Sequence, residues 1–133
     1  NDSVQGGSGN DYLEGGAGND LLSGDVGDDI IDGYRGNDLL SGGAGNDLLD
    51  GGAGFDTASW EDSLAGIVVN LSDEAVSGLS ILPDTAIAAR SAQDGYDTTD
   101  SLFNIESVIG SDHNDAFISS LADERFDGGL GER

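Results

Sequence analysis

Apolar residues recur every nine positions through the first half of the chain, and each lies two positions after an aspartate. Each one sits in the middle of a three-residue run that is bounded by glycine-rich turns. Because side chains alternate across a strand, this middle residue is predicted to point inward from a short strand. The pattern therefore predicts an all-β fold. The inward residues are Val4, Leu13, Leu22, Ile31, Leu40, Leu49 and Ala58.

The repeating unit is visible from Gly6 onward, and Asn1–Gln5 reads as the end of a preceding unit. Self-similarity at a fixed period is typical of stacked repeats rather than of a single irregular domain. The successive units are GGSGNDYLE, GGAGNDLLS, GDVGDDIID, GYRGNDLLS, GGAGNDLLD and GGAGFDTAS. Their aspartates, with the one that precedes them, are Asp2, Asp11, Asp20, Asp29, Asp38, Asp47 and Asp56.

The residue types in each unit suit a calcium site. Glycine permits backbone conformations with positive φ and a close approach to a ligand, so Gly-Gly-x-Gly-x-Asp can aim carbonyl oxygens at one point. Calcium prefers roughly six to eight oxygen ligands and accepts carboxylates and carbonyls together. One unit supplies too few oxygens, so a site needs two stacked units. A flexible acidic linker is the alternative, but a linker has no reason to keep aspartate and leucine in phase.

These units resemble the RTX (repeats-in-toxin, hemolysin-type) calcium-binding nonapeptide repeats, and the resemblance covers residues 1–59. It implies a right-handed parallel β-roll in which two units form one coil, so that units two apart stack on each other. The expected inner ladders consist of Leu13, Ile31 and Leu49, and of Leu22, Leu40 and Ala58.

The same stacking divides the aspartates between two edges of the roll. One edge carries Asp11, Asp29 and Asp47, and the other carries Asp2, Asp20, Asp38 and Asp56. Two gaps on the first edge and three on the second imply about five calcium ions. In the family, an ion takes the first and third carbonyls and the aspartate of one unit, and the second and fourth carbonyls and the aspartate of the next coil. The candidate ligands are Asp2, Gly6, Gly7, Ser8, Gly9, Asp11, Gly15, Gly16, Ala17, Gly18, Asp20, Gly24, Asp25, Val26, Gly27, Asp29, Gly33, Tyr34, Arg35, Gly36, Asp38, Gly42, Gly43, Ala44, Gly45, Asp47, Gly51, Gly52, Ala53, Gly54 and Asp56.

Two units depart from the glycine pattern. Asp25 replaces the second glycine of the third unit, and Tyr34 and Arg35 fill the second and third positions of the fourth. A carbonyl ligand survives any side chain, but strain is expected beside Tyr34, which makes that gap the weakest. Asp25 is either an extra ligand or a solvated side chain, and the solvated state is favoured.

The position after each aspartate is also apolar in most units, and it should face outward. Exposed apolar stripes usually mark an interface, so residues 60–109 or a partner module are predicted to cover one of them. The alternative is a mildly adhesive sheet surface. The stripes consist of Tyr12, Ile30 and Leu48 on one face and of Leu21 and Leu39 on the other.

The nine-residue rhythm stops at Ser59, and residues 60–109 are predicted to cap the roll with mixed strand and loop. This segment resembles the stretches between RTX blocks in proteins like the adenylate cyclase toxin. Gly66–Leu71 reads as a strand, Leu102–Ile109 as one or two strands, and Asp84–Gln93 as a short helix. Trp60 is expected to plug the last coil.

Residues 110–133 resemble the degenerate start of a second RTX block. Asp115 stands in the aspartate position and is added to the candidate calcium ligands. His113 is the sole histidine, and a structural or solvated role is favoured for it. Tyr96, Asp97 and Asp100 form either a local turn or a further calcium site, and the turn is favoured.

Charge narrows the possible partners. The chain carries 27 acidic and 4 basic residues, for a net charge of −23, and no cysteine. This charge argues against binding to nucleic acid or to an anionic membrane, and it favours cations. Without cations, the repulsion and the shortage of aromatic residues favour disorder. The absence of cysteine excludes disulfides and thiolate metal sites.

Three classes of function follow. The first is a calcium-binding module of a secreted bacterial protein, exported by type I secretion and folded by calcium outside the cell or at its surface, as RTX toxins are. The second is an enzyme, but the sequence offers no catalytic constellation; the parent protein could still be an enzyme, such as a mannuronan epimerase, protease or lipase, with this chain as an accessory module. The third is an adhesin or S-layer segment. The implied partners are calcium ions and neighbouring domains of the parent chain.

Overall fold

The chain forms thirteen strands and no helix within residues 1–75, 88–119 and 124–129, which are the residues that the computed structural model describes. In this part of the chain, nothing helical is long and apolar enough to cross a bilayer. The strands are β1 (Ser3–Ser8), β2 (Tyr12–Ala17), β3 (Leu21–Val26), β4 (Ile30–Arg35), β5 (Leu39–Ala44), β6 (Leu48–Asp50), β7 (Thr57–Ser59), β8 (Val68–Asn70), β9 (Ser91–Gln93), β10 (Thr99–Phe103), β11 (Ser107–Ile109), β12 (Ala116–Ile118) and β13 (Arg125–Asp127). The predicted all-β fold is confirmed.

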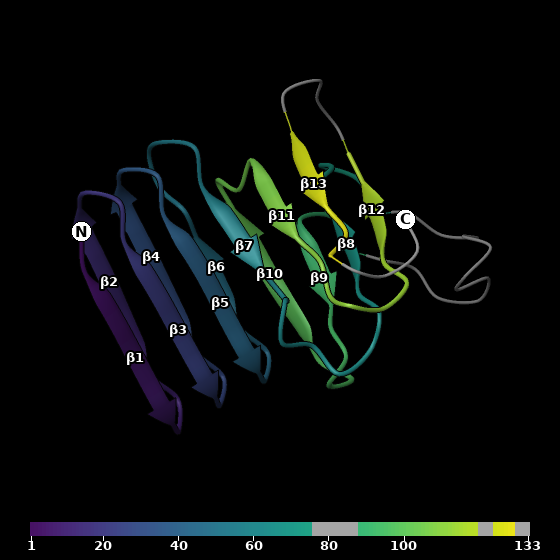
Figure 1. The fold of residues 1–133 in the computed structure, drawn as a ribbon, viewed down its shortest axis with the longest axis horizontal. Coiled ribbons are helices and arrows are strands. Elements are labelled where there is room, and N and C mark those ends of the chain that lie inside the picture. The colour runs from purple at the N-terminus through teal and green to yellow at the C-terminus, as the bar shows by residue number, and fades with distance from the viewer. Residues whose placement is uncertain (76–87, 120–123, 130–133) are drawn as a thin grey trace.

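Successive strands of the repeat array alternate between two sheets that face each other (Figure 1). One sheet has the order β1-β3-β5-β7-β11-β13, and the other has the order β12-β8-β9-β10-β6-β4-β2. The pairing within the array is parallel, and it joins Leu13 to Ile31 and Ile31 to Leu49. One coil therefore contains two nine-residue units, as predicted for a parallel β-roll.

The strands of the array are longer than the predicted three residues. Strands β1 to β5 each span six residues, because they continue through the first three positions of the next unit. The backbone groups of these glycine-rich positions find partners on the neighbouring coil, for example Gly16 opposite Tyr34. A buried backbone group needs a hydrogen-bond partner, so the ladder extends into the turn.

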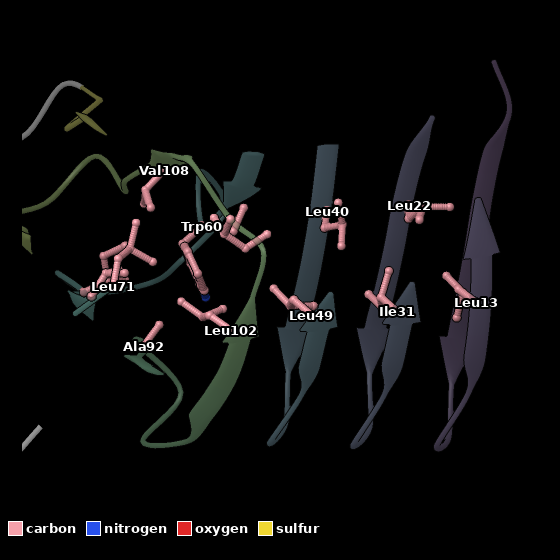
Figure 2. Packing of buried hydrophobic residues seen from close by; sticks show 14 residues of the cluster. Leu13, Leu22, Ile31, Leu40, Leu49, Trp60, Leu71, Ala92, Leu102 and Val108 are labelled. Carbon is pink, nitrogen blue, oxygen red and sulfur yellow. The ribbon is translucent and has the colours of Figure 1, made fainter. Parts of the chain in front are cut away.

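The core is a thin double row of side chains between the sheets (Figure 2). Leu22, Ile31, Leu40 and Leu49 are completely buried, and they form the two inner ladders that the repeat predicts. Full burial of one such side chain contributes about 1.5–3 kcal/mol. With one large side chain per strand, the array has little hydrophobic stabilisation to set against its charge.

Residues after the array extend the same two sheets rather than covering a face. Strand β10 pairs with β6 and β11 pairs with β7, both in parallel, and Leu102 and Val108 continue the core. The predicted strands in Gly66–Leu71 and Leu102–Ile109 are confirmed as β8, the end of β10, and β11. Trp60 is 3% exposed in the core, as expected of a plug.

One prediction about this region is wrong, and another is met only in part. Ser91–Gln93 forms strand β9, antiparallel to β8 and β10, and not the end of a helix; residues 84–87 lie outside the described part. Residues 60–109 leave Tyr12, Leu21 and Ile30 of the outer stripes exposed, at 60%, 47% and 44%, whereas Leu39 and Leu48 are half-buried; a partner module as the cover stays a prediction. The reason is that the strands after the array extend the two sheets along the axis of the roll, which leaves the outer faces of the sheets open.

Candidate metal centre

The repeat aspartates stack on two edges of the roll and bind to each other's backbone. Oδ1 of Asp29 accepts a hydrogen bond of 2.8 Å from the N–H of Asp11, one coil earlier. Oδ1 of Asp56 accepts a bond of the same length from the N–H of Asp38 on the other edge. The spacing of 18 residues confirms that units two apart are neighbours. Each aspartate thus has one oxygen fixed by the preceding coil.

The second oxygen of these aspartates is buried and has no hydrogen-bond partner. This holds for Oδ2 of Asp11, Asp20, Asp29, Asp38, Asp47 and Asp56. All of these side chains except that of Asp11 are at most 3% exposed. An isolated carboxylate is costly to bury unless it is paired or coordinates a metal. Such oxygens, repeated at fixed intervals along each edge, are therefore expected to bind cations.

The first glycine of each unit leaves space beside this oxygen. A Cβ atom added at Gly33 would lie 2.5 Å from Oδ2 of Asp38 and 2.6 Å from the carbonyl oxygen of Gly51 on the next coil. At Gly6 the corresponding distances, to Asp11 and Gly24, are 2.8 and 2.9 Å. The space in each gap is therefore lined by a carboxylate oxygen and by the first carbonyl of the following coil.

The other carbonyls of the loop alternate in direction. The third-position carbonyl points back to the earlier coil, since Val26 O accepts the N–H of Gly9 at 2.8 Å. The second and fourth carbonyls point forward, since the carbonyls of Asp25 and Gly27 contact the positions that a Cβ would take on Gly43 and Gly45.

Six oxygens consequently line a complete gap. The later coil faces the gap with its first and third carbonyls and the earlier coil with its second and fourth, which is the reverse of the order expected from the family. The earlier aspartate adds its unpartnered Oδ2, and the later aspartate adds Oδ1, which also accepts a backbone N–H. This donor set suits calcium, which takes roughly six to eight oxygens and accepts carbonyls readily. No group of three or more His, Cys, Asp or Glu side chains lies together in the described part, so backbone carbonyls complete the set.

The irregular units keep the backbone of the regular ones. Asp25 and Tyr34 adopt φ values of 75° and 69°, so they reproduce the left-handed conformation of the second-position glycines. The carbonyl of Tyr34 accepts the N–H of Ala53 at 2.8 Å on the next coil. The side chain of Asp25 accepts a hydrogen bond of 2.6 Å from Ser23 Oγ, and is thus held away from the gap.

Burial shifts the acidity of these carboxyl groups. Desolvation raises the pKa of Asp29 and Asp38 above the ordinary value, and neighbouring carboxylates such as Asp11 and Asp20 add to the effect. Desolvation also raises the pKa of Asp47 and Asp56 to about 6. Without a cation, the folded roll therefore holds protons that an unfolded chain would release.

Two acidic residues extend the aspartate ladders in a way that the sequence did not predict: Asp100 was assigned to a turn, and Glu106 was not singled out. Asp100 stacks on Asp47 and accepts its N–H at 3.0 Å, and Glu106 stacks on Asp56 and accepts its N–H at 2.9 Å. Asp100 is completely buried, which raises its pKa to about 7. The signal was an acidic residue two positions before an apolar one, as in the repeat. The predicted turn holds for Asp97, with φ 61°, but Asp100 lies in strand β10.

A second ladder, formed by the residue before each aspartate, was also missed. Oδ1 of Asn10 accepts the N–H of Asp28 at 3.0 Å, and Oδ1 of Asn19 accepts that of Asn37 at 2.9 Å. These bonds run in the direction opposite to the aspartate bonds. Adjacent coils are thus joined by two side-chain-to-backbone hydrogen bonds at each such pair of loops.

The remaining candidates differ from the buried aspartates. Asp2 is exposed, although its N–H donates to Asp20 at 2.6 Å. Asp115 lies in a ladder position beside Ile67, whose N–H it accepts at 2.9 Å, but its Oδ2 accepts the N–H of Ser111. His113 is exposed.

Comparison with known protein families gives one match. Residues 1–31 and 23–58 match the model of the RTX calcium-binding nonapeptide repeat, in four copies. A comparison with curated proteins finds no match to the chain.

Proposed function

We propose that this chain is a module of a secreted protein that folds when calcium binds, since residues 1–58 match the model of the RTX calcium-binding nonapeptide repeat. The observation that carries the proposal is the set of six buried, unpartnered aspartate oxygens on the two edges, five of which share their gap with a carbonyl of the following coil or turn. Calcium would neutralise these carboxylates, and each ion would join two adjacent coils by binding oxygens of both coils. Metal binding would then supply the folding free energy that the thin core lacks.

The number of ions follows from the gaps between complete loops. Two gaps on each edge are flanked by complete loops, and a fifth lies between Asp2 and Asp20 with one incomplete loop. About five ions are therefore proposed for the array. Extracellular calcium modules bind at about 10⁻⁴–10⁻³ M, so the chain would stay unfolded inside the cell and fold after type I secretion.

The parent protein is proposed to be a toxin or another secreted protein that this module stabilises or presents. The array is a structural calcium-binding module, and its carboxylates are accounted for by cation sites. An accessory role beside an extracellular enzyme is the second candidate, and an adhesin or S-layer segment is the third. Both are compatible with the open outer faces at Tyr12, Leu21 and Ile30, which could receive neighbouring domains.

A calcium titration monitored by circular dichroism tests the proposal. The chain should lack β structure in chelator and gain it cooperatively with calcium, whereas magnesium should fail because it demands strict octahedral geometry. A chain that is equally folded in chelator would exclude the proposal. Asp29→Ala and Asp38→Ala should each weaken binding on a different edge, since their ladders do not share a gap.

A further inference from the structure

The array ends on the Asp56 edge in a turn that is not a repeat unit. Strand β10 ends at Phe103 and β11 begins at Ser107, so three residues replace the six-residue loop Gly51–Asp56 of the coil beneath. Both strands keep the register of the array, because Phe103 pairs with Asp50 and Ser107 pairs with Thr57. The short turn therefore stacks directly on the last calcium loop.

Glu106 takes the place of the repeat aspartate in this turn. Its Oε2 accepts the N–H of Asp56 at 2.9 Å, as Oδ1 of Asp56 accepts the N–H of Asp38 at 2.8 Å. The carbonyl of Asp56 in turn accepts the N–H groups of Glu106 and Ser107 at 3.1 and 2.9 Å. The additional methylene of glutamate provides the reach that the shorter turn lacks.

Asn104 takes the place of the first glycine of a unit. Its carbonyl oxygen contacts the position that a Cβ of Gly51 would occupy, as the carbonyl of Gly51 does at Gly33. The side chain of Asn104 donates to Asp50 Oδ1 at 2.7 Å, and its φ is 51°. The turn is thereby held with this carbonyl over the gap.

Asp56 shows that this gap needs a ligand. The residue is completely buried, and its Oδ2 has no hydrogen-bond partner. The ion pairs in the described part join Arg90 to Asp73 and the N-terminal amine to Asp20. The guanidinium of Arg125 lies 5.6 Å from the centre of the Phe55 ring. Within the described residues, therefore, no cationic group of the protein is paired with Asp56 or Glu106.

We propose that Asp56, Asn104 and Glu106 form a further calcium site, outside the nonapeptide repeats, at which the array is joined to the segment that caps it. The donors are Asp56 Oδ2, the Asn104 carbonyl and the Glu106 carboxylate. The second and fourth carbonyls of the last loop, at Gly52 and Gly54, are assigned by analogy with those of Asp25 and Gly27, which point to the next coil, and they complete a set of five oxygens. Glutamate can bind calcium through both oxygens, which gives the six that calcium requires. The site rests on the proposed function, since it uses the same chemistry.

The end of the other edge is closed differently. Both oxygens of Asp100 are occupied, one by the N–H of Asp47 at 3.0 Å and the other by Nε1 of Trp60 at 3.0 Å. The three atoms nearest to a Cβ at Gly42 all belong to Asp47, so no carbonyl approaches as closely as Asn104 does at Gly51. Oδ2 of Asp47 is also buried without a hydrogen-bond partner, but both oxygens of Asp100 above it are taken and no carbonyl lies as close, so this end lacks the donor set of the Asp56 end.

Counting bound ions tests the site directly. Glu106→Gln keeps an acceptor for the Asp56 N–H but removes the charge, and in equilibrium dialysis against saturating calcium it should bind one ion fewer than the unmodified chain. Glu61→Gln is the matched control, because it removes the same charge at an exposed side chain outside the ladders, and it should bind the full number. Equal ion numbers for Glu106→Gln and the unmodified chain would overturn the site. If the unmodified chain bound no calcium at all, the proposed function itself would fail.

A second measurement does not depend on any variant. Anomalous diffraction from crystals of the unmodified chain grown in calcium should show a peak between Asp56 and Asn104, in addition to those in the array. Peaks in the array without one at this position would also overturn the site.

Discussion

The glycines of a unit are required for two different reasons. The second and fourth positions have positive φ, for example 89° at Gly52 and 156° at Gly54, and they need a residue that tolerates it. The first-position glycines have no positive φ, and they are required because a Cβ would fill the gap. This distinction explains why Asp25 and Tyr34 are accepted at the second position, while every first position in the array is glycine.

Gly33→Ala tests the role of this space. Its backbone suits alanine, but the Cβ would lie 2.5 Å from Asp38 Oδ2 and would occupy the place of the ion. We expect calorimetry to show the loss of one calcium site, or an affinity lower by on the order of tenfold for that site. Ala53→Ser, at an exposed third position, is the control and should bind normally. Unchanged binding by Gly33→Ala would contradict the proposed position of the ion.

Acidity gives a second prediction at this scale. Since burial raises the pKa of Asp47 and Asp56 to about 6, their contribution to calcium-free stability is greatest below the unfolded value near 4 and is lost as pH rises through 6. The calcium-free chain should therefore gain β structure as the pH is lowered from 7.5 to 4.5. Calcium must displace these protons, so its midpoint concentration should rise as pH falls. Titrations at matched ionic strength measure both effects, and a midpoint independent of pH would exclude this linkage.

At the scale of elements, the strands that could be predicted most fully from the sequence are those that lie in the nine-residue repeats. The array strands and their inner ladders followed from a period that every unit repeats, and the aspartate edges followed from their stacking. Strand β9 could not be recognised, because Ser91–Gln93 gains its conformation by pairing with β8 and β10, and tertiary pairing overrides local propensity. The stacking of Asp100 and Glu106 was not predicted because more than forty residues separate them from the partners that they stack on, Asp47 and Asp56.

Trp60 shows how strand β10, which is far from the array in the sequence, is held against it. Its indole N–H donates to Asp100 Oδ2 at 3.0 Å in the core, where the carboxylate is completely buried. Trp60→Phe keeps an aromatic ring but leaves that oxygen unpartnered, which should cost about 1–3 kcal/mol of unfolding free energy. Denaturant unfolding in saturating calcium measures the loss. Leu64→Ala, at a side chain that is 71% exposed, should leave stability unchanged. If the two variants were equally stable, the hydrogen bond would not hold β10 in place.

At the scale of the whole molecule, stability depends on neutralising the charge of the roll and on covering its last coil. A net charge of −23 opposes compaction of the calcium-free chain, and the thin core offers little stabilisation against it. Once calcium neutralises the edges, the last coil of a solenoid would still expose its inner residues and its strand edges. Strands β10 and β11 remove both exposures, because they pair with β6 and β7 and place Leu102 and Val108 over the final rungs.

Truncation separates the array from this cap. A chain of residues 1–59 keeps every nonapeptide unit but loses the strands that pair with β6 and β7, and it uncovers Leu49 and Ala58. Unpaired strand edges and apolar rungs promote association, so the shortened chain should form oligomers or stay partly unfolded in saturating calcium. The full chain retains β10 to β13, and this control should fold as a monomer. Sedimentation velocity with circular dichroism distinguishes the two chains. A monomeric, fully folded 1–59 would mean that the calcium-loaded array is stable without the strands that follow it, and that those strands serve another purpose.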